Sequence, residues 1–568
     1  MHDLVIRQGT VVDGTGRERF EGDVAIDEGR IAAVGHVDGR GRREIDARGC
    51  VVAPGRVDIH THYDGQATWD PILAPSSWNG VTTLVMGNCG VGFAPVRPGT
   101  EDFLIELMEG VEDIPGTALH EGIDWRWESF GEYLDALAGM ERVLDIAAQV
   151  PHCAVRAYVL GERAHELDVR DQEIAEMARI TREGLAAGAL GFSTSRTVLH
   201  RSVHGLVPGT ASHPREMLAL GQALGDAGHG VFEMVSDGAI GQNEELAWMR
   251  SFCRATGRPL TFALAQLPGA PTAYRQTLAR AEQWAGEGAH IAPQVPCRPT
   301  GMLFGLQSTI HPFVGHPTCQ DLAPLPLAER VARLRDPSVR ARLLAEQTRL
   351  QDPIAKGLLT NLAQIYWLGD PPDYEPPPER SVAAAAAREE RRPEEVVLDW
   401  MLEAEGRNFL FAPLANYADG DFEALREMML HPSTVLGLSD GGAHCGLICD
   451  ASMPTYLLSH WVRDRTRGER IPLEQAVRLQ TSNTARVYGL TDRGTLEPGK
   501  QGDVNVIDLD ALRLHAPEMI HDLPAGGRRL TQRVEGYRAT VCRGEVTWEE
   551  GEPTGAMPGK LVRGGAKT

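Results

Sequence analysis

Both ends of the chain carry the alternation of apolar and polar residues that is typical of half-buried β-strands. Six short segments show it, separated by glycine-containing turns: 3–12, 22–34, 43–52, 503–507, 538–542 and 544–547. The two sets lie at opposite ends of the sequence, on either side of a long α/β middle. We therefore predict that residues 1–54 and 486–568 come together as one small β-sandwich domain.

The middle of the chain alternates apolar runs of strand length with helical patterns. Eight such runs occur, at residues 57–62, 82–86, 145–150, 190–193, 230–235, 260–264, 291–295 and 434–438. Eight strands that alternate with helices indicate an α/β fold of the (β/α)8, TIM-type barrel class. We predict that residues 55–485 form this barrel, with the catalytic residues at the carboxyl ends of its strands.

This middle segment is much longer than the roughly 250 residues that a minimal barrel needs. The surplus lies at about 302–430. Within it, residues 327–350 and 383–395 have helical composition, and residues 371–379 are rich in proline. We predict a helical insertion in the barrel, with the character of a subdomain or lid.

Charge and cysteine content exclude several classes of protein. The chain has 568 residues, with 56 Lys+Arg against 78 Asp+Glu and a net charge of −22. Nucleic-acid and anionic lipid surfaces need clustered cations, so neither is an expected partner. The nine cysteines are scattered without a CxxC pair, which argues against a disulfide scaffold. The N-terminus does not resemble a signal peptide, and the sequence has no run of about 18 apolar residues that could span a membrane. We expect a soluble cytoplasmic protein, and the sequence leaves a homo-oligomer open.

Four residues at strand ends are candidates for a metal site. His60 and His62 are two residues apart at the end of the first barrel strand. Residues at this spacing share one face of a strand, so both imidazoles can bind one ion. Cys89 ends the next strand and is either a thiolate ligand or an inert buried cysteine. Asp440 follows the last strand and is either a turn residue or a metal ligand that also acts as a proton shuttle.

Six segments carry motifs that are more specific than these patterns: 53–64 (APGRVDIHTHYD), 80–90 (GVTTLVMGNCG), 188–194 (GALGFST), 439–444 (SDGGAH), 483–486 (NTAR) and 496–500 (LEPGK). Together they resemble the amidohydrolase superfamily, specifically its N-acyl-D-amino-acid deacylase (D-aminoacylase) branch. The resemblance covers nearly the whole chain apart from residues 302–430. It implies a metal-dependent hydrolase that acts on carbon–nitrogen bonds other than peptide bonds.

The same resemblance implies a metal position formed by the histidine pair and Asp440. Cys89 would serve where many superfamily members use a carboxylated lysine. The superfamily's second position draws histidines from the fifth and sixth strands, where this chain has Glu233 and Leu264. A leucine cannot bind a metal, and Glu233 would be either a ligand or part of a structural ion pair. We therefore expect one metal per chain, and imidazole and thiolate ligands favour Zn²⁺.

Four further residues are candidates for substrate binding. Arg196 and His200 follow the fourth strand, where the loops face the site and a cation can hold a substrate carboxylate. Arg298 follows the seventh strand, beside a cysteine that stands where the branch has a carboxylate-binding tyrosine. His152 follows the third strand, where the branch has a similar histidine. Ordinary loop solvation or a structural role would account for each of them as well.

We expect the protein to cleave a linear C–N amide bond of an N-acyl amino acid or a related peptide-like small molecule. A metal-activated water would attack the carbonyl carbon while Asp440 shuttles the proton. Two alternatives stay open. One is a cyclic-amide hydrolase of the hydantoinase or dihydroorotase kind, which usually has a metal-bridging lysine. The other is a non-catalytic barrel scaffold. The acyl group, the amine and the stereochemistry of the substrate are not determined at this level.

Overall fold

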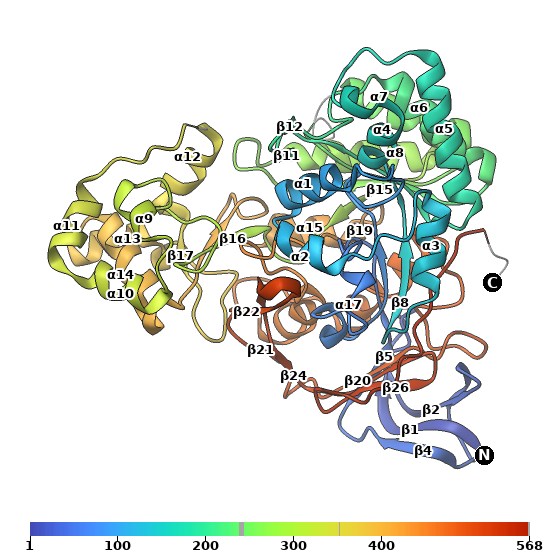
Figure 1. The fold of residues 1–568 in the computed structure, drawn as a ribbon. Coiled ribbons are helices and arrows are strands. Elements are labelled where there is room, and N and C mark those ends of the chain that lie inside the picture. The colour runs from blue at the N-terminus through green and yellow to red at the C-terminus, as the bar shows by residue number, and fades with distance from the viewer. Residues whose placement is uncertain (238–242, 352, 566–568) are drawn as a thin grey trace.

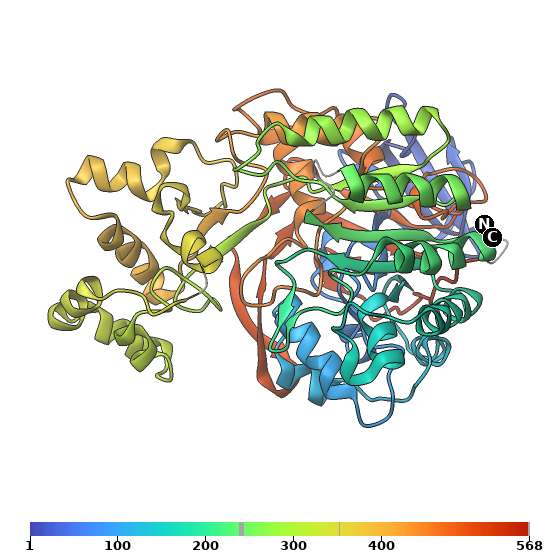
Figure 2. The same cartoon turned by 90° about the horizontal axis from the view of Figure 1, so that it is seen from above.

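Three regions make up the molecule in this computed structural model, which describes residues 1–237, 243–351 and 353–565. Figure 1 shows a β-rich region built from the two ends of the chain, an α/β region built from its middle, and a helical lobe that projects to one side. The view from above in Figure 2 shows the same projecting lobe. The candidate site residues lie in the α/β region.

Two parallel sheets form the α/β region. The first contains β6 (Arg56–Asp58), β7 (Val81–Met86) and β8 (Asp145–Ala148). The second contains, in pairing order, β9 (Val150–Pro151), β10 (Gly191–Arg196), β13 (Val231–Ser236), β14 (Leu260–Ala263), β15 (Ile291–Val295) and β19 (Val435–Leu436). Only Gln149 separates β8 from β9, and a parallel bridge joins Thr61 to Gly441. Each of the eight predicted runs overlaps one of these strands.

Helices connect the strands and pack around them (Figures 1 and 2). They are α1 (Glu101–Glu112), α2 (Gly116–Gly122), α3 (Phe130–Ala138), α4 (His152–Leu160), α5 (Asp171–Ala186), α6 (Pro214–Ala227), α7 (Asn243–Thr256), α8 (Ala273–Gly286), α15 (Glu423–Leu430), α16 (Met453–Tyr456), α17 (Leu473–Leu479) and α18 (Ser482–Val487). Helix α5 is typical, because Ile174, Met177 and Leu185 recur at helical spacing and form its buried stripe. Within the described residues, no helix combines the length and apolar character that a membrane span requires.

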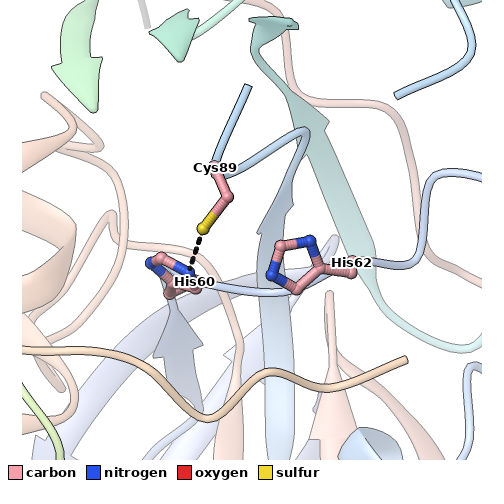
Figure 3. A group of neighbouring side chains, drawn as sticks. All are labelled: His60, His62 and Cys89. Atoms are coloured by element: carbon pink, nitrogen blue, oxygen red, sulfur yellow. Dashed lines mark hydrogen bonds between the residues drawn. The ribbon is translucent and has the colours of Figure 1, made fainter. Parts of the chain in front are cut away.

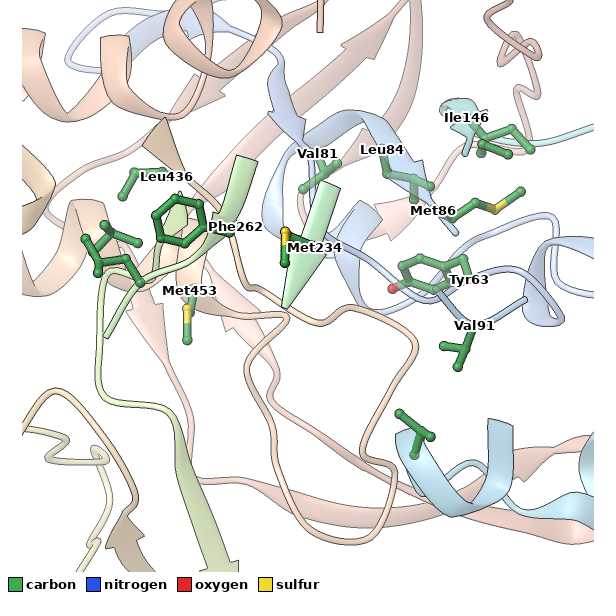
Figure 4. Packing of buried hydrophobic residues seen from close by; sticks show 14 of the residues in the cluster. Tyr63, Val81, Leu84, Met86, Val91, Ile146, Met234, Phe262, Leu436 and Met453 are labelled. Carbon is green, nitrogen blue, oxygen red and sulfur yellow. The ribbon is translucent and has the colours of Figure 1, made fainter. Parts of the chain in front are cut away.

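The strands of the α/β region are buried on both faces, as parallel strands usually are. All six residues of β7 are buried. Leu84, Met234 and Phe262, on three different strands, belong to one large hydrophobic cluster that also includes side chains of the surrounding helices (Figure 4). Dense packing of this kind leaves side chains little freedom. The strand ends therefore form a firm base for the site.

The two ends of the chain meet in a single sheet. Its nine strands are β1 (His2–Val11), β2 (Phe20–Asp27), β3 (Arg30–Gly35), β4 (Gly41–Asp46), β5 (Val51–Pro54), β20 (Val504–Ile507), β25 (Tyr537–Cys542), β26 (Glu545–Glu549) and β27 (Glu552–Pro553). Strands β5 and β20 pair antiparallel and so join the N-terminal half of the sheet to the C-terminal half. Two further antiparallel pairs follow β20. Strand β21 (Arg513–Leu514) pairs with β24 (Val534–Glu535), and the hairpin of β22 (Glu518–Leu523) and β23 (Gly527–Thr531) lies between them in the chain.

The projecting lobe holds most of the predicted helical insertion and has its own hydrophobic cluster. Its helices are α9 (Pro317–Leu322), α10 (Leu327–Arg335), α11 (Pro337–Ala345), α12 (Pro353–Thr360), α13 (Val382–Glu389) and α14 (Pro393–Gly406). The segment 327–350, which was expected to be helical, contains two helices, because Asp336 caps α11 and Pro337 begins it. A sheet of β16 (Gly301–Phe304), β18 (Leu410–Pro413) and β17 (Tyr366–Trp367) lies at its base and was not predicted. Its two longer strands are some hundred residues apart, so local pattern could not reveal the pairing.

Asp145, at the start of β8, ties the C-terminal part of the chain to the α/β region. Its buried carboxylate accepts hydrogen bonds from Arg493 Nη1 at 2.8 Å and from Arg543 Nη1 at 3.0 Å. It also accepts one from the backbone N–H of Lys560 at 2.7 Å. Removing one partner of a buried ion pair leaves the other charge without compensation, which is costly.

We predict that Asp145→Asn lowers the free energy of unfolding by about 3 kcal/mol, because the buried Arg493 keeps its pair with Asp492 but loses the fully buried carboxylate of Asp145. Urea unfolding of both proteins measures the difference. The matched control is Glu518→Gln, which removes the charge of an exposed pair with Arg533 and should cost less than about 1 kcal/mol. Equal losses in the two variants would contradict the prediction.

Candidate metal centre

Three predicted ligands converge at the carboxyl ends of the first two strands of the α/β region. His60 and His62 follow β6 and Cys89 follows β7, and one ligand atom of each lies within 4.8 Å of the others. Cys89 Sγ is 3.3 Å from His60 Nε2. All three residues are buried, and their side chains point toward one another in Figure 3. Among the described residues, this is the one group of three or more metal-binding side chains that meets this distance limit.

Asp440 lies beside the two imidazoles although it is some 380 residues away in the sequence. Its Oδ1 is 3.4 Å from His60 Nε2 and 3.8 Å from His62 Nε2. The backbone holds it there, because the N–H of Asp440 donates to the His60 carbonyl at 3.1 Å and the N–H of His62 donates to the Gly441 carbonyl at 2.8 Å. The Nε2 atoms of both histidines therefore face the same carboxylate oxygen.

A buried glutamine orients the ring of His60. Gln294, on β15, places its Oε1 2.9 Å from His60 Nδ1, and its Nε2 donates to Thr261 Oγ1 at 3.0 Å. A proton on Nδ1 would donate to this amide oxygen and leave Nε2 free as a ligand. Partners of this kind fix the tautomer and the orientation of metal-binding histidines.

Glu233 lies at the centre, whereas Leu264 contributes only packing. Glu233 Oε2 accepts a hydrogen bond from the backbone N–H of Cys89 at 2.8 Å, and its Oε1 is 3.6 Å from His60 Nδ1. Leu264 is fully buried in the main hydrophobic cluster. The carboxylate therefore borders the site on the side where the resemblance placed a second metal, but the neighbouring leucine has no ligand atom.

Burial and the close charges shift several pKa values at the centre. Burial lowers the pKa of His60 to about 4. Burial also disfavours the charged form of His62, but the carboxylates of Glu112 and Asp440 outweigh it and raise the pKa of His62 to about 9. Burial raises the pKa of Glu233 to about 8 and holds the pKa of the Cys89 thiol well above its ordinary value. A divalent cation stabilises such a group of buried carboxylate and thiolate ligands.

The backbone is left-handed at both Cys89 and Asp440. Their φ angles are +55° and +49°, and Leu438 and His444 in the same loop as Asp440 are also positive, at +64° and +54°. Conformations of this kind are costly for residues other than glycine and cluster at functional sites. The strain is consistent with ligands that are aimed by a rigid framework.

Three of the four predicted substrate-binding residues are engaged elsewhere in the protein. Arg196 pairs with Glu245 through two hydrogen bonds. Arg298 is buried, donates to Asp450 Oδ1 at 3.0 Å, and lies 3.9 Å above the ring centre of Tyr374. The guanidinium groups of both arginines are thus already neutralised by buried carboxylates.

Of the two histidines predicted to bind substrate, one is engaged by other side chains on both ring nitrogens and the other is not. His152 is held between Glu216 and Thr194, each at 2.8 Å from one ring nitrogen. Within the described residues, the ring of His200 makes one hydrogen bond, between its Nδ1 and Ser195 Oγ at 3.0 Å. Burial and the neighbouring imidazoles of His444 and His62 lower the pKa of His200 to about 3. The groups that shift the pKa of His200 thus include residues of the candidate metal centre.

Two residues of the site were missed at the sequence level. Gln294 is a polar residue within an otherwise apolar buried strand, which is the pattern that could have revealed it. Glu112 ends helix α1 on the same helical face as the buried residues Ile105 and Met108. A charged residue on a buried helical stripe is unusual, and its Oε1 lies 3.3 Å from His62 Nδ1.

Known proteins show where this arrangement belongs. A D-aminoacylase of Alcaligenes xylosoxydans xylosoxydans is 34% identical over 193 residues, which is 34% of this chain and 37% of that protein. The aligned part therefore spans little more than a third of that relative. An N-acyl-D-glutamate deacylase of the same organism is 27% identical over 569 residues, covering 99% of this chain and 96% of that protein.

A solved structure supports the fold. The N-acyl-D-glutamate deacylase from Bordetella bronchiseptica, complexed with zinc and a phosphonate inhibitor, matches with a TM-score of 0.65 at 22% identity, over 99% of both chains. The sequence profile of the amidohydrolase family matches residues 43–548, which is most of the chain. With its two parallel sheets and the histidine pair after the first strand, this chain has the amidohydrolase fold and belongs to the amidohydrolase family.

Proposed function

We propose that this protein is a metal-dependent amidohydrolase that cleaves a linear C–N amide bond of an N-acyl amino acid or a related peptide-like small molecule. The observation that carries the proposal is the convergence of His60, His62 and Cys89, with one oxygen of Asp440 beside both imidazoles. Membership of the amidohydrolase family and the deacylases among its relatives support the same chemistry.

We propose that the metal is a single zinc ion held by His60, His62, Cys89 and Asp440. Nitrogen, sulfur and carboxylate ligands of this number suit the tetrahedral preference of zinc. The fixed ring of His60 and the buried positions of all three converging ligands support this assignment. A complete second site is not part of the proposal, because Leu264 has no ligand atom to offer and Glu233 Oε2 is already bonded to the Cys89 N–H.

Within this site, Asp440 is the proposed proton shuttle. Bound zinc would polarise the substrate carbonyl and lower the pKa of water to about 7. Asp440 has one oxygen facing the imidazoles, and the His62, His60 and His444 imidazoles outweigh burial and keep its pKa below the usual range. It is therefore ionised at neutral pH and able to accept the proton from the attacking water. It then donates that proton to the leaving nitrogen.

We propose that His200 binds the substrate from the loop after β10. Its Nδ1 is held by Ser195, so Nε2 is the nitrogen left for a substrate group. Arg196, Arg298 and His152 would reach a substrate only by exchanging their bonds to Glu245, Asp450 and Glu216. Their role in the proposal is therefore to support the loops that line the site.

The cyclic-amide alternative is less well supported by this chain. Hydrolases of that kind usually have a metal-bridging lysine, and the four lysines of the sequence are Lys356, Lys500, Lys560 and Lys567. None of them comes from the strands that carry the ligands. The scaffold alternative does not explain why a thiol, imidazoles and carboxylates are buried together, because burying such groups costs free energy unless they are paired or bind a metal.

We also propose a domain arrangement around this site. The two parallel sheets would close into one eight-stranded barrel through Gln149 and the bridge between Thr61 and Gly441. Residues 1–54 and 486–568 would form the small β-sandwich domain. The barrel would occupy residues 55–485, with its insertion at about 302–430. The insertion and the chain ends each have a separate hydrophobic cluster, and the largest cluster lies mainly in the barrel.

The metal assignment predicts that protein purified without added metal contains about one zinc per chain, and that His60→Ala/His62→Ala contains none, because two of the proposed ligands are removed. Elemental analysis of both proteins measures this. No metal in the wild type, even after soaking with zinc, would contradict the hydrolase proposal and favour the scaffold. Two equivalents would mean that a second position exists, with Glu233 as a ligand or with a ligand from elsewhere than Leu264.

The proton-shuttle role predicts that Asp440→Asn lowers kcat/KM by roughly 10²- to 10⁴-fold, because an amide cannot take up the proton. N-acyl-D- and N-acyl-L-amino acids assayed with zinc in excess provide the rates. Zinc content determined on the same samples separates loss of the shuttle from loss of the metal. Full activity of Asp440→Asn with bound zinc would exclude Asp440 as the shuttle.

The substrate-binding role of His200 predicts that His200→Ala raises KM roughly 10-fold, because one hydrogen bond to the bound substrate is lost. The matched control is His204→Ala, four residues further along the same loop. His204 is partly exposed and pairs with Glu106 at 2.6 Å. We expect a larger rise in KM for His200→Ala than for His204→Ala. An equal rise in both variants would indicate a general disturbance of the loop and contradict the prediction.

A further inference from the structure

Glu112 is a buried carboxylate that lies behind one of the proposed metal ligands. It is the last residue of α1 and is 1% exposed. Its Oε1 is 3.3 Å from His62 Nδ1, and its Oε2 is 3.6 Å from His444 Nε2. The chemistry proposed above does not use it.

This position is unfavourable for a carboxylate unless it has a specific partner. The carboxyl end of a helix carries a partial negative charge, which repels an acidic side chain. Burial adds a desolvation cost that only a close opposite charge or hydrogen bonds can offset. The two imidazoles are the groups at ion-pair distance from Glu112. The placement of the carboxylate is thus explained by the histidines that it faces.

The two ring nitrogens of His62 face different groups. Nε2 is directed to Asp440 Oδ1, the oxygen that also lies beside His60 Nε2. Nδ1 is directed to Glu112 Oε1. Within the described part of the chain, neither Nδ1 nor Oε1 has a hydrogen-bond partner, and both are buried. Their separation of 3.3 Å is just beyond the usual range of about 2.7–3.2 Å for an N–H···O hydrogen bond.

The end of α1 is anchored to the loop that follows Asp440, so the carboxylate cannot readily move away. The carbonyl of Glu112 accepts a hydrogen bond from the backbone N–H of His444. The next residue, Asp113, accepts from the N–H of Gly446 at 2.9 Å. Helix α1 and the metal-binding loop therefore keep a fixed relation to each other.

We propose that Glu112 is a positioning residue for the metal centre, which accepts the Nδ1–H of His62 and so keeps Nε2 of this ring directed at the metal. Its charge makes the imidazole a stronger ligand, and its second oxygen holds His444 beside Asp440. This inference rests on the proposed function, because it assumes that His62 is a ligand.

The test compares the zinc affinity of full-length Glu112→Gln with that of the wild type, by competition with a chelator. Glutamine keeps the shape of the side chain but lacks the charge. We expect the zinc affinity to fall about 10- to 100-fold. The thermal midpoint of the zinc-free protein should change little. The matched control is Glu109→Gln, one turn earlier on α1. Glu109 is exposed and accepts a hydrogen bond from the N–H of Gly116, away from the centre. The zinc affinity of Glu109→Gln should therefore equal that of the wild type.

The outcomes separate the inference from the proposed function. Equal zinc affinity of Glu112→Gln and the wild type would overturn the inference and leave the function intact. A wild type that binds no zinc would overturn both. If the wild type bound two zinc ions and Glu112→Gln only one, Glu112 would be a direct ligand, and the positioning role would be wrong.

A second measurement on the wild type covers the case in which Glu112→Gln does not fold. Nitrogen NMR of ¹⁵N-histidine-labelled, zinc-loaded protein reports which ring nitrogen carries the proton. The signals of His62 are those lost in His62→Asn. We expect a protonated Nδ1 and a zinc-bound Nε2, and zinc on Nδ1 would overturn the inference.

Discussion

The contact between the first and the last strand segments of the α/β region is the constraint on which the site depends. Thr61 and Gly441 pair in parallel, and the backbones of His60, His62 and Asp440 are linked by hydrogen bonds. The side chain of Ser439 adds a further bond to the buried carboxylate of Asp58. Without this contact, the histidine pair and the aspartate would be distant parts of the chain with no common function.

Once these segments meet, electrostatics shapes the rest of the centre. Glu112, Glu233 and Asp440 bring carboxylates from three different elements around two imidazoles and a thiol. Each of them is costly to bury alone. The cost is offset when opposite charges and hydrogen bonds satisfy all of them together, which is the environment that a tightly held cation provides. The left-handed backbone at Cys89 and Asp440 is a further cost that the surrounding packing must support.

The centre is also asymmetric, which supports the proposal of a single metal. On one side, Gln294 and Glu233 border His60. On the other side, Glu112 and His444 border His62. The proposed ligand atoms are thus concentrated around one position, and in our proposal the groups around it orient those ligands. The helical lobe has a hydrophobic cluster of its own, and the segment that leads into it contacts the surroundings of the centre, because Thr309 donates to Asp113 and to the Gly446 carbonyl.

The sequence by itself determined the eight strands, the pairing of both chain ends in one β region, and the identity of His60, His62 and Cys89 as a group. Strand periodicity and the i, i+2 rule are local properties, so they can be derived from neighbouring residues. The tertiary structure alone decided the partners of these residues. Gln294 behind His60, Glu112 behind His62 and the buried pairs of Arg196 and Arg298 all join residues that are far apart in the chain. No periodicity records such contacts, because they arise only when strands and helices pack.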